Sequence, residues 1–257
     1  MVGVTFRPLL ALALVPLAAC GSSGGSGSSA SGSIRAAVNA TIAAGTAKEE
    51  VSSLTPTASA TSKSSATGTY SFTNHVGAFA VTTDAFLGNL DVVVSGSTLY
   101  IKVPAALLTA SKGKPWAGVD MTNPPTVPGA GNVASLAGAA DPTRALTQLQ
   151  EGIVSASKVG AATVGTTAAT QYTAKIDLAK AKSAQAASEK TLIGGSTATD
   201  DVFIGADNRI LRIVSKVNLS GGAVETLTID YSGYGTPVTT QQPSAADTVD
   251  AATLLGQ

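Results

Sequence analysis

The feature that most constrains this chain is a short apolar segment near its N-terminus that ends at the only cysteine, Cys20. The segment runs from Pro8 to Ala19, follows Arg7 and closes with small residues, which is the pattern of a secretory signal peptide. It is too short to cross the roughly 30 Å of hydrocarbon in a bilayer. An exported chain with a single thiol cannot form an internal disulfide, so its fold has to rest on a hydrophobic core.

The residues around the cysteine indicate what it does. Leu17-Ala18-Ala19-Cys20 resembles the lipobox of bacterial lipoproteins, in which the cysteine thiol receives a diacylglyceryl group and a peptidase cuts before the cysteine. The resemblance implies a signal peptide over residues 1–19 and a mature protein that starts at Cys20. This lipid would anchor it to the extracytoplasmic face of the cell membrane, because two acyl chains give stable attachment. The alternative is an ordinary signal peptide with a chance cysteine.

The composition limits the partners of the mature protein. Lys and Arg together number 16, as do Asp and Glu, so loss of Arg7 with the signal peptide leaves 15 − 16 = −1. No basic run is present, and nucleic-acid binding needs a positive footprint, so we expect no nucleic-acid partner. No second apolar segment of the sequence is long enough to span a membrane.

Residues 20–33 consist of Cys20 and a stretch dominated by Gly and Ser. This composition predicts a flexible linker that carries no chemistry. A short helix is expected next, with Ser33 as its N-cap and Gly45 as its stop. Its apolar stripe consists of residues at every fourth position: Ile34, Val38 and Ile42.

Residues 47 to 103 have the alternation that is typical of β-strands. Leu99, Ile101 and Val103 share one face, and the residues 95–97 before them, Ser-Gly-Ser, predict a hairpin turn. Residues 52–65 are mostly Ser, Thr and Ala, and they fit either a solvated edge strand or a loop.

Residues 104–140 contain most of the mid-chain prolines and many glycines, so regular structure is not expected there. Asp141-Pro142 then predicts a helix that ends near Gly160. Three apolar residues at helical spacing should point from this helix toward the sheet: Leu146, Leu149 and Ile153.

Strands return in the last third of the chain. One is expected to start at Val164, and another alternates over residues 172–178. Residues 179–190 are rich in Ala, Lys and Glu and suit an exposed helix. The later strands are separated by tight turns, which indicates an antiparallel meander with one apolar and one wet face.

Three segments carry a resemblance to a known family: Asp141-Pro142-Thr143-Arg144-Ala145-Leu146, Val202-Phe203-Ile204-Gly205-Ala206-Asp207-Asn208-Arg209 and Asp230-Tyr231-Ser232-Gly233-Tyr234. Their order resembles the mycobacterial LppX/LprAFG lipoproteins and the wider LolA-like superfamily over residues 34–250, which leaves 251–257 as a C-terminal tail. The resemblance implies an α+β fold, in which a curved antiparallel β-sheet, or half-barrel, has helices packed on its concave face. It also implies a lipid or glycolipid ligand, lipid transport and a possible lipid exporter as a partner.

The residues themselves allow two interiors. Sparse, Ala-rich helices provide little volume to fill the space above a sheet, which favours an apolar cavity for acyl chains. The alternative is that the helices pack tightly on the sheet and leave no cavity. Alternation selects the candidate lining residues but does not say which face is concave. These candidates are Leu99, Ile101, Val103, Leu146, Leu149, Ile153, Tyr172, Ile176, Leu211 and Ile213.

Catalytic and metal-binding patterns are missing from the sequence. His75 is the only histidine and falls in an expected turn, and no serine has a Gly-x-Ser-x-Gly setting. Asp200-Asp201 and Asp207 come nearest to a metal site, but their setting predicts turns. We therefore expect no enzyme activity and no cofactor. Two functions remain: a lipid-binding carrier, or a structural or accessory envelope lipoprotein with a filled core and no ligand.

Overall fold

A computed structural model describes residues 29–56, 61–83, 88–121, 142–181, 193–219 and 222–254 of the chain. Cys20, the expected signal peptide and most of the expected linker lie outside these residues. The elements, in chain order, are α1 (Ala30–Ala43), β1 (Thr46–Pro56), β2 (Thr61–Ser71), β3 (Val76–Thr83), β4 (Asn89–Ser95), β5 (Thr98–Lys102), the 3-10 helix η1 (Ala105–Leu107), β6 (Trp116–Asp120), α3 (Pro142–Gly152), β7 (Ile153–Val164), β8 (Thr167–Asp177), β9 (Ile193–Gly205), β10 (Ile210–Leu219), β11 (Val224–Ser232), β12 (Thr248–Asp250) and α5 (Ala251–Leu254).

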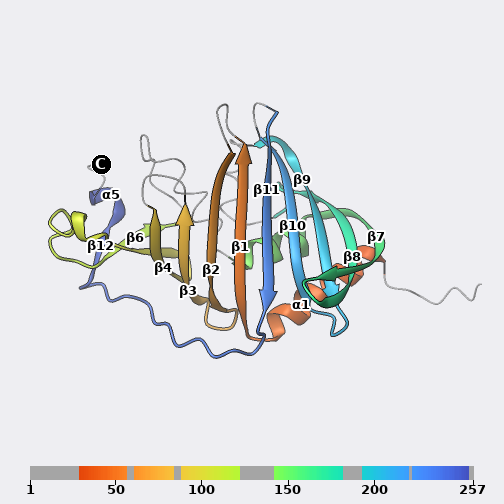
Figure 1. The fold of residues 1–257 in the computed structure, drawn as a ribbon, viewed down its shortest axis with the longest axis horizontal. Coiled ribbons are helices and arrows are strands. Elements are labelled where there is room, and N and C mark those ends of the chain that lie inside the picture. Colours follow the sequence, from red (N-terminus) through yellow and green to blue (C-terminus); the bar gives the residue numbers. More distant parts are fainter. Residues whose placement is uncertain are drawn as a thin grey trace, which may run out of the picture.

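One large sheet contains every strand described. Its twelve strands follow the order β12-β6-β5-β4-β3-β2-β1-β11-β10-β9-β8-β7, so the sheet has two separate edges and is not closed (Figure 1). Neighbouring strands are antiparallel except at one edge, where β12 runs parallel to β6. The sheet consists of two meanders, β1 to β6 and β7 to β11, which are joined where β1 pairs with β11. The expected α+β fold with a curved antiparallel sheet is confirmed.

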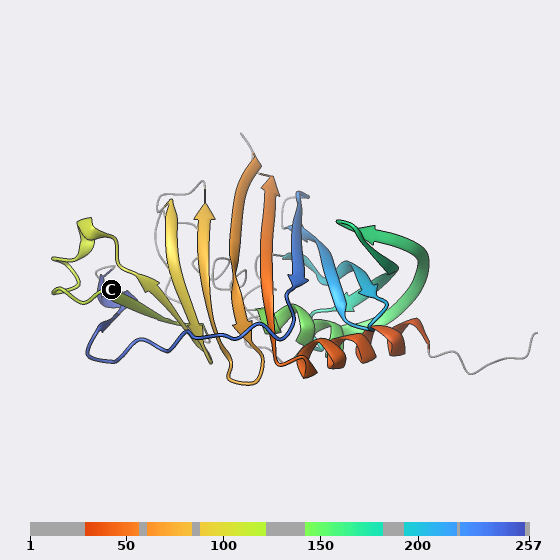
Figure 2. The same ribbon diagram turned by 60° about the horizontal axis from the view of Figure 1, so that its bottom comes forward.

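Alternate residues of each strand point to a common inner face. On β1, Ala47, Val51 and Ser53 are buried, whereas their neighbours Lys48 and Ser52 are exposed. The inner residues of the other strands belong to the same apolar core as buried residues of the two longer helices. The helices α1 and α3 contact each other and lie mainly against β7 to β10 (Figures 1 and 2). The core therefore lies between these helices and one face of the sheet.

Helix α1 starts earlier than the sequence predicts. Its N-cap is Ser29, whose hydroxyl accepts a hydrogen bond from the Gly32 amide at 3.2 Å, so the prediction of Ser33 is wrong and residues 30–33 are helical. The stripe that is buried follows a 3.6-residue period: Ile34, Ala37, Val38 and Thr41. Ile42 lies off this stripe and is 42% exposed. Gly45 ends the segment as expected, with a φ of +79°.

Helix α3 is shorter than the sequence predicts. It ends at Gly152, and the next residue, Ile153, begins β7, so the predicted helix end near Gly160 and strand start at Val164 are both wrong. A Cβ on Gly152 would lie 2.7 Å from Cγ2 of Ile176, so this passage from helix to strand has no room for a side chain. The Arg35 guanidinium of α1 donates to the Gln150 carbonyl at 3.0 Å, which satisfies a carbonyl at the end of α3.

Several other expectations can be compared with the structure. Residues 52–65 belong to β1 and β2 on either side of residues 57–60, which resolves the choice in favour of strands. The turn at residues 95–97 is confirmed, with Gly96 at a φ of +57°. Strand β6 lies inside the segment that was expected to be irregular, so that expectation is wrong for residues 116–120. Most of the helix predicted over residues 179–190 lies outside the described residues.

The chain after β11 returns across the sheet to its far edge (Figures 1 and 2). Along this return the Gln242 side-chain amide donates to the Tyr100 hydroxyl at 2.8 Å. The Trp116 amide then donates to the Asp247 carbonyl at 3.1 Å where β12 joins β6. The segment expected to be a tail from residue 251 begins instead with α5, and Ala251 is buried in the core.

Candidate functional site

The inner face of the sheet brings most of the predicted lining residues together. Seven of the candidates are buried members of one apolar core: Leu99, Val103, Leu146, Leu149, Ile153, Ile176 and Ile213. Ile101 and Tyr172 are partly buried and pack against the same core. Leu146 and Leu149 of α3 are completely buried, which agrees with the prediction that this helix faces the sheet.

Leu211 is the candidate that the structure places elsewhere. A register shift between Ile210 and Arg212 inserts a bulge into β10, so the strict alternation assumed from the sequence fails there. As a result Ile210 and Ile213, at 0% and 1% exposure, both point inward. Leu211 lies near Gly205, which occupies an outward position of β9. A Cβ added to Gly205 would be 3.3 Å from Cδ1 of Leu211. The sequence analysis missed Ile210 for this reason.

Two glycines on the inner face of β2 and β3 make room for aromatic rings. Gly68 is paired with Phe79, and a Cβ on Gly68 would lie 2.5 Å from the Phe79 ring. Gly77 is paired with Tyr70, whose ring would lie 2.6 Å from a Cβ on Gly77. The rings therefore lie over the backbone of the neighbouring strand, and this part of the core depends on the absence of two side chains.

Asp200 is a buried carboxyl in the middle of β9, which corrects the prediction that it lies in a turn. It is 3% exposed and is paired with Ser215 of β10 and Ala174 of β8. Burial raises its pKa to about 6, the hydrogen bond from Ser215 opposes this shift, and the negative charge of Asp201 adds to it. No hydrogen-bond donor in the described parts of the chain reaches its Oδ1 atom.

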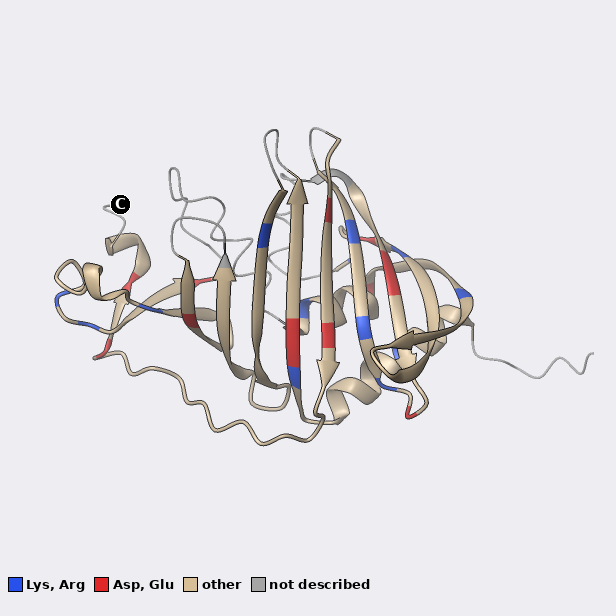
Figure 3. Cartoon of the chain, viewed as in Figure 1, with Lys and Arg blue, Asp and Glu red and all other residues tan. Residues whose placement is uncertain are grey.

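A second carboxyl lies on the same face, one register step farther along the strands. Glu225 of β11 accepts a hydrogen bond from the Ser53 hydroxyl at 2.9 Å and another from the Thr55 hydroxyl at 3.2 Å. Glu49 of β1 is a third carboxyl on this face and is 2% exposed. Charged residues are sparse along the strands (Figure 3), so three carboxyls on the inner face are a distinct feature. Sequence reasoning found none of them, although the alternation of residues 198 to 204 could have assigned Asp200 to the apolar face.

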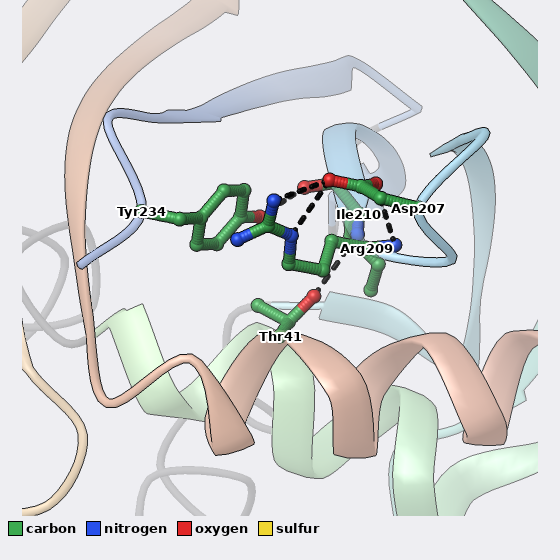
Figure 4. A network of polar contacts seen from close by, with 5 residues as sticks. All are labelled: Thr41, Asp207, Arg209, Ile210 and Tyr234. Atoms are coloured by element: carbon green, nitrogen blue, oxygen red, sulfur yellow. Dashed lines mark hydrogen bonds and ion pairs between the residues drawn. The ribbon is translucent and has the colours of Figure 1, made fainter.

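A polar network fixes the turn between β9 and β10 to helix α1 (Figure 4). The Ile210 amide donates to the Thr41 hydroxyl at 2.9 Å, and the Tyr234 hydroxyl donates to the Ile210 carbonyl. The Arg209 guanidinium lies 4.4 Å from the centre of the Tyr234 ring and 2.5 Å from the Asp207 carboxylate. The network therefore joins two of the segments that carry the resemblance, residues 202–209 and residues 230–234.

The same network shifts two pKa values. Partial burial is the largest single effect on the pKa of Asp207 and raises it, but the hydrogen bonds and positive charge of Arg209 together outweigh it, so the pKa lies below its usual range. Burial raises the pKa of Tyr234, and the hydrogen bond with Thr41 only partly opposes this shift. Asp207 is therefore a carboxylate and Tyr234 a neutral hydrogen-bond donor, which is the arrangement of a structural clamp.

The described residues offer little for catalysis. They contain no group of three or more His, Cys, Asp or Glu side chains that could hold a metal ion. His75 is exposed in the turn between β2 and β3, as expected, with a φ of +51°. Within the same ranges, no helix has both the length and the hydropathy needed to cross a membrane.

Comparison with known proteins gives a partial sequence match to an uncharacterised protein and a likeness in fold to solved mycobacterial proteins. No protein-family model matches the chain. A 110-residue stretch is 32% identical to an uncharacterised 31.2 kDa protein of Streptomyces griseus, and the match spans 39% of this chain and 36% of that protein. The crystal structure of LprF from Mycobacterium bovis is 15% identical, with a TM-score of 0.46, over 84% of this chain and 97% of LprF.

The likeness to LppX of Mycobacterium tuberculosis is the informative one. That lipoprotein is 16% identical, with a TM-score of 0.53, and the match covers 82% of this chain and 97% of LppX. The chain therefore has the fold of LppX.

Proposed function

We propose that this protein is an envelope lipoprotein, anchored to the cell membrane by a diacylglyceryl group on Cys20, that binds the acyl chains of a lipid on the inner face of its sheet and carries that lipid. A lipid exporter in the membrane is the partner that such a carrier would serve. The observation that carries the proposal is the extent of the apolar inner face. The main contacts of α1 and α3 are with β7 to β10. Apolar side chains nevertheless continue inward across β2 to β5, where Phe79, Val92 and Leu99 lie.

This continuous apolar surface suits acyl chains, which need contact with aliphatic and aromatic groups and few polar partners. The apolar character of this face also fits the LppX-type fold, in which the sheet forms a half-barrel and the interior lies along one of its faces. The anchor is supported by the position of Cys20 behind Leu17-Ala18-Ala19.

A second function is a structural or accessory lipoprotein with a filled core. It is favoured by a specific observation, because Leu146, Leu149 and Ile176 are completely buried where α3 meets the sheet. Helix and sheet are thus tightly packed at this place. The two functions differ in one measurable property, which is whether the folded protein retains lipid.

The first test is native mass spectrometry on the protein from residue 29 onward, expressed in an actinobacterial host, with organic extraction of any bound lipid. We expect lipid to be retained. A protein that is folded but consistently empty would overturn the carrier and favour the filled core.

The second test is Leu149→Trp, which places an indole on the inward side of α3. If this helix borders the ligand, the larger side chain should lower the retained lipid, because it competes for the same volume. The matched control is Ile42→Trp, which makes the same kind of change on α1 at a site that is 42% exposed. Circular dichroism reports folding, and Leu149→Phe is a milder variant if the Trp variant does not fold. Equal lipid occupancy in folded Leu149 variants and the control would show that α3 does not face the ligand.

A further inference from the structure

The inner face of the sheet changes its chemistry along the strands. The register places Val51, Ile229, Ile213 and Val202 in one apolar row across β1, β11, β10 and β9. The next inward row on the same strands contains Ser53, Leu227, Ser215 and Asp200. Glu225, with its bonds from Ser53 and Thr55, lies one step beyond. The apolar row thus borders a polar end at Asp200 and Glu225, and on its other side the next row holds Glu49 and Tyr231. An apolar row that borders a polar end is the profile of a surface that holds an amphiphile.

Asp200 is the residue of this polar end that has an acceptor atom without a hydrogen-bond donor from the described chain. Its carboxyl receives a hydrogen bond from Ser215, yet its Oδ1 is buried with no donor from the described chain. Buried polar atoms of native proteins are nearly always paired, so an open acceptor on an inner face calls for an explanation. A hydrogen-bond donor brought by a ligand provides one.

The contacts around Asp200 also define which donors fit. Asp201, its neighbour, points to the other face, where it accepts a hydrogen bond from Thr173 at 2.6 Å and has Lys216 at 3.8 Å. That lysine therefore belongs to the outer face. A carboxyl beside Ser215 attracts hydroxyl and ammonium groups and repels an anion such as phosphate.

We propose that Asp200, supported by Ser215, forms a headgroup subsite that accepts a hydrogen bond from a hydroxyl or ammonium group of the bound lipid. The acyl chains then lie along the apolar row of Val202, Ile213 and Ile229. This inference rests on the proposed lipid binding and adds the residue that selects the head of the lipid.

The test uses lipids that share their acyl chains and differ at the head. The probes are 1,2-dioleoylglycerol, its 3-acetyl derivative, 1,2-dioleoyl-3-dimethylammonium-propane and dioleoyl phosphatidic acid. Their affinities for the delipidated protein can be measured by native mass spectrometry. We expect dioleoylglycerol or the ammonium lipid to bind about tenfold more tightly than the acetyl derivative, since a hydrogen bond to a buried carboxyl is lost in the latter. Phosphatidic acid should bind more weakly than either donor.

Three variants separate the contribution of Asp200 from that of the fold. Asp200→Val removes the acceptor and should reduce the preference to less than about twofold. Asp200→Asn keeps an acceptor without charge, so it should retain a preference for the hydroxyl lipid and lose any preference for the ammonium lipid. Asp201→Val, on the opposite face of the same strand, should leave the preferences unchanged.

The outcomes distinguish failure of the headgroup subsite from failure of lipid binding itself. Equal affinity of the wild-type protein for the acetyl derivative and for both donor lipids, dioleoylglycerol and the ammonium lipid, would overturn the subsite while leaving lipid binding intact. A full preference in Asp200→Val would do the same, because the preference would then not depend on the Asp200 carboxyl. Failure of the wild-type protein to bind any of the four lipids would overturn the proposed function as well.

Discussion

Asp200→Asn should make this protein more stable at neutral and alkaline pH, although it removes a buried hydrogen-bonding charge. The pKa of Asp200 is raised from 3.8 to about 6 in the folded state. A raised carboxyl pKa means that the folded state binds the proton more tightly than the unfolded state does. The folded state therefore loses stability as the pH rises through the window from about 4 to about 6, and the loss is complete above it.

The magnitude follows from the shift. The difference of 6 − 3.8 = 2.2 units corresponds to about 3 kcal/mol at about 1.4 kcal/mol per unit. Asparagine carries no charge and escapes this penalty, while its carbonyl can still accept from Ser215. We therefore expect the free energy of unfolding of Asp200→Asn to exceed that of the wild type by up to about 3 kcal/mol at about pH 8. The two proteins should differ little below about pH 4.

Urea unfolding at both pH values, followed by circular dichroism, measures this difference. Asp201→Asn is the matched control, because it makes the same change on the opposite face. That variant weakens the 2.6 Å bond from Thr173, so it should lose about 0.5–1.5 kcal/mol and not gain stability at about pH 8. A gain in Asp200→Asn that is equal at both pH values, or no gain at about pH 8, would refute the argument that the buried carboxylate is costly.

Three further changes test the clamp, the packing and the anchor. Thr41→Val should lower the free energy of unfolding by about 1–3 kcal/mol, since it removes the acceptor of the 2.9 Å bond from Ile210, whereas Thr41→Ser should preserve most of the stability in the same urea assay. Gly68→Ala should cost about 1–3 kcal/mol because its Cβ would lie 2.5 Å from the Phe79 ring, and a wild-type unfolding midpoint would contradict the packing described. Cys20→Ala should move the protein from the membrane fraction to the soluble or secreted fraction, and complete membrane retention on an immunoblot would contradict the lipid anchor.

Local patterns predicted the class of the fold well. Leu99 and Ile101 both point from β5 toward the core, and sequence spacing alone reveals that they share a face. The inward positions of Leu146 and Leu149 follow from helical spacing in the same way. These predictions held because each depends on a few neighbouring residues.

The errors arose where tertiary contacts override a local pattern. Ile153 continues the helical spacing of Leu149, but it pairs with Ile176 of β8 and so begins β7 instead of extending the helix. The bulge after Ile210 shifts the inward positions by one residue, and no alternation rule can detect it. Asp200 was assigned to a turn on chemical grounds, because a carboxyl on an apolar face contradicts the usual pattern of a strand.

The seam between β1 and β11 also determines the order in which this protein can fold. Val51 and Ile229 are paired across 229 − 51 = 178 residues, and closing such a loop from an open chain costs about 5 kcal/mol of entropy. Hairpins between sequential strands close much shorter loops and form faster. Each meander can therefore assemble before the two meanders pair. Until then, β1 and β11 are edge strands with unpaired backbone N–H and C=O groups, to which a strand of another chain could add. Pairing of β1 with β11 covers these two exposed edges at once, and only β7 and β12 remain at the edges of the completed sheet of described strands.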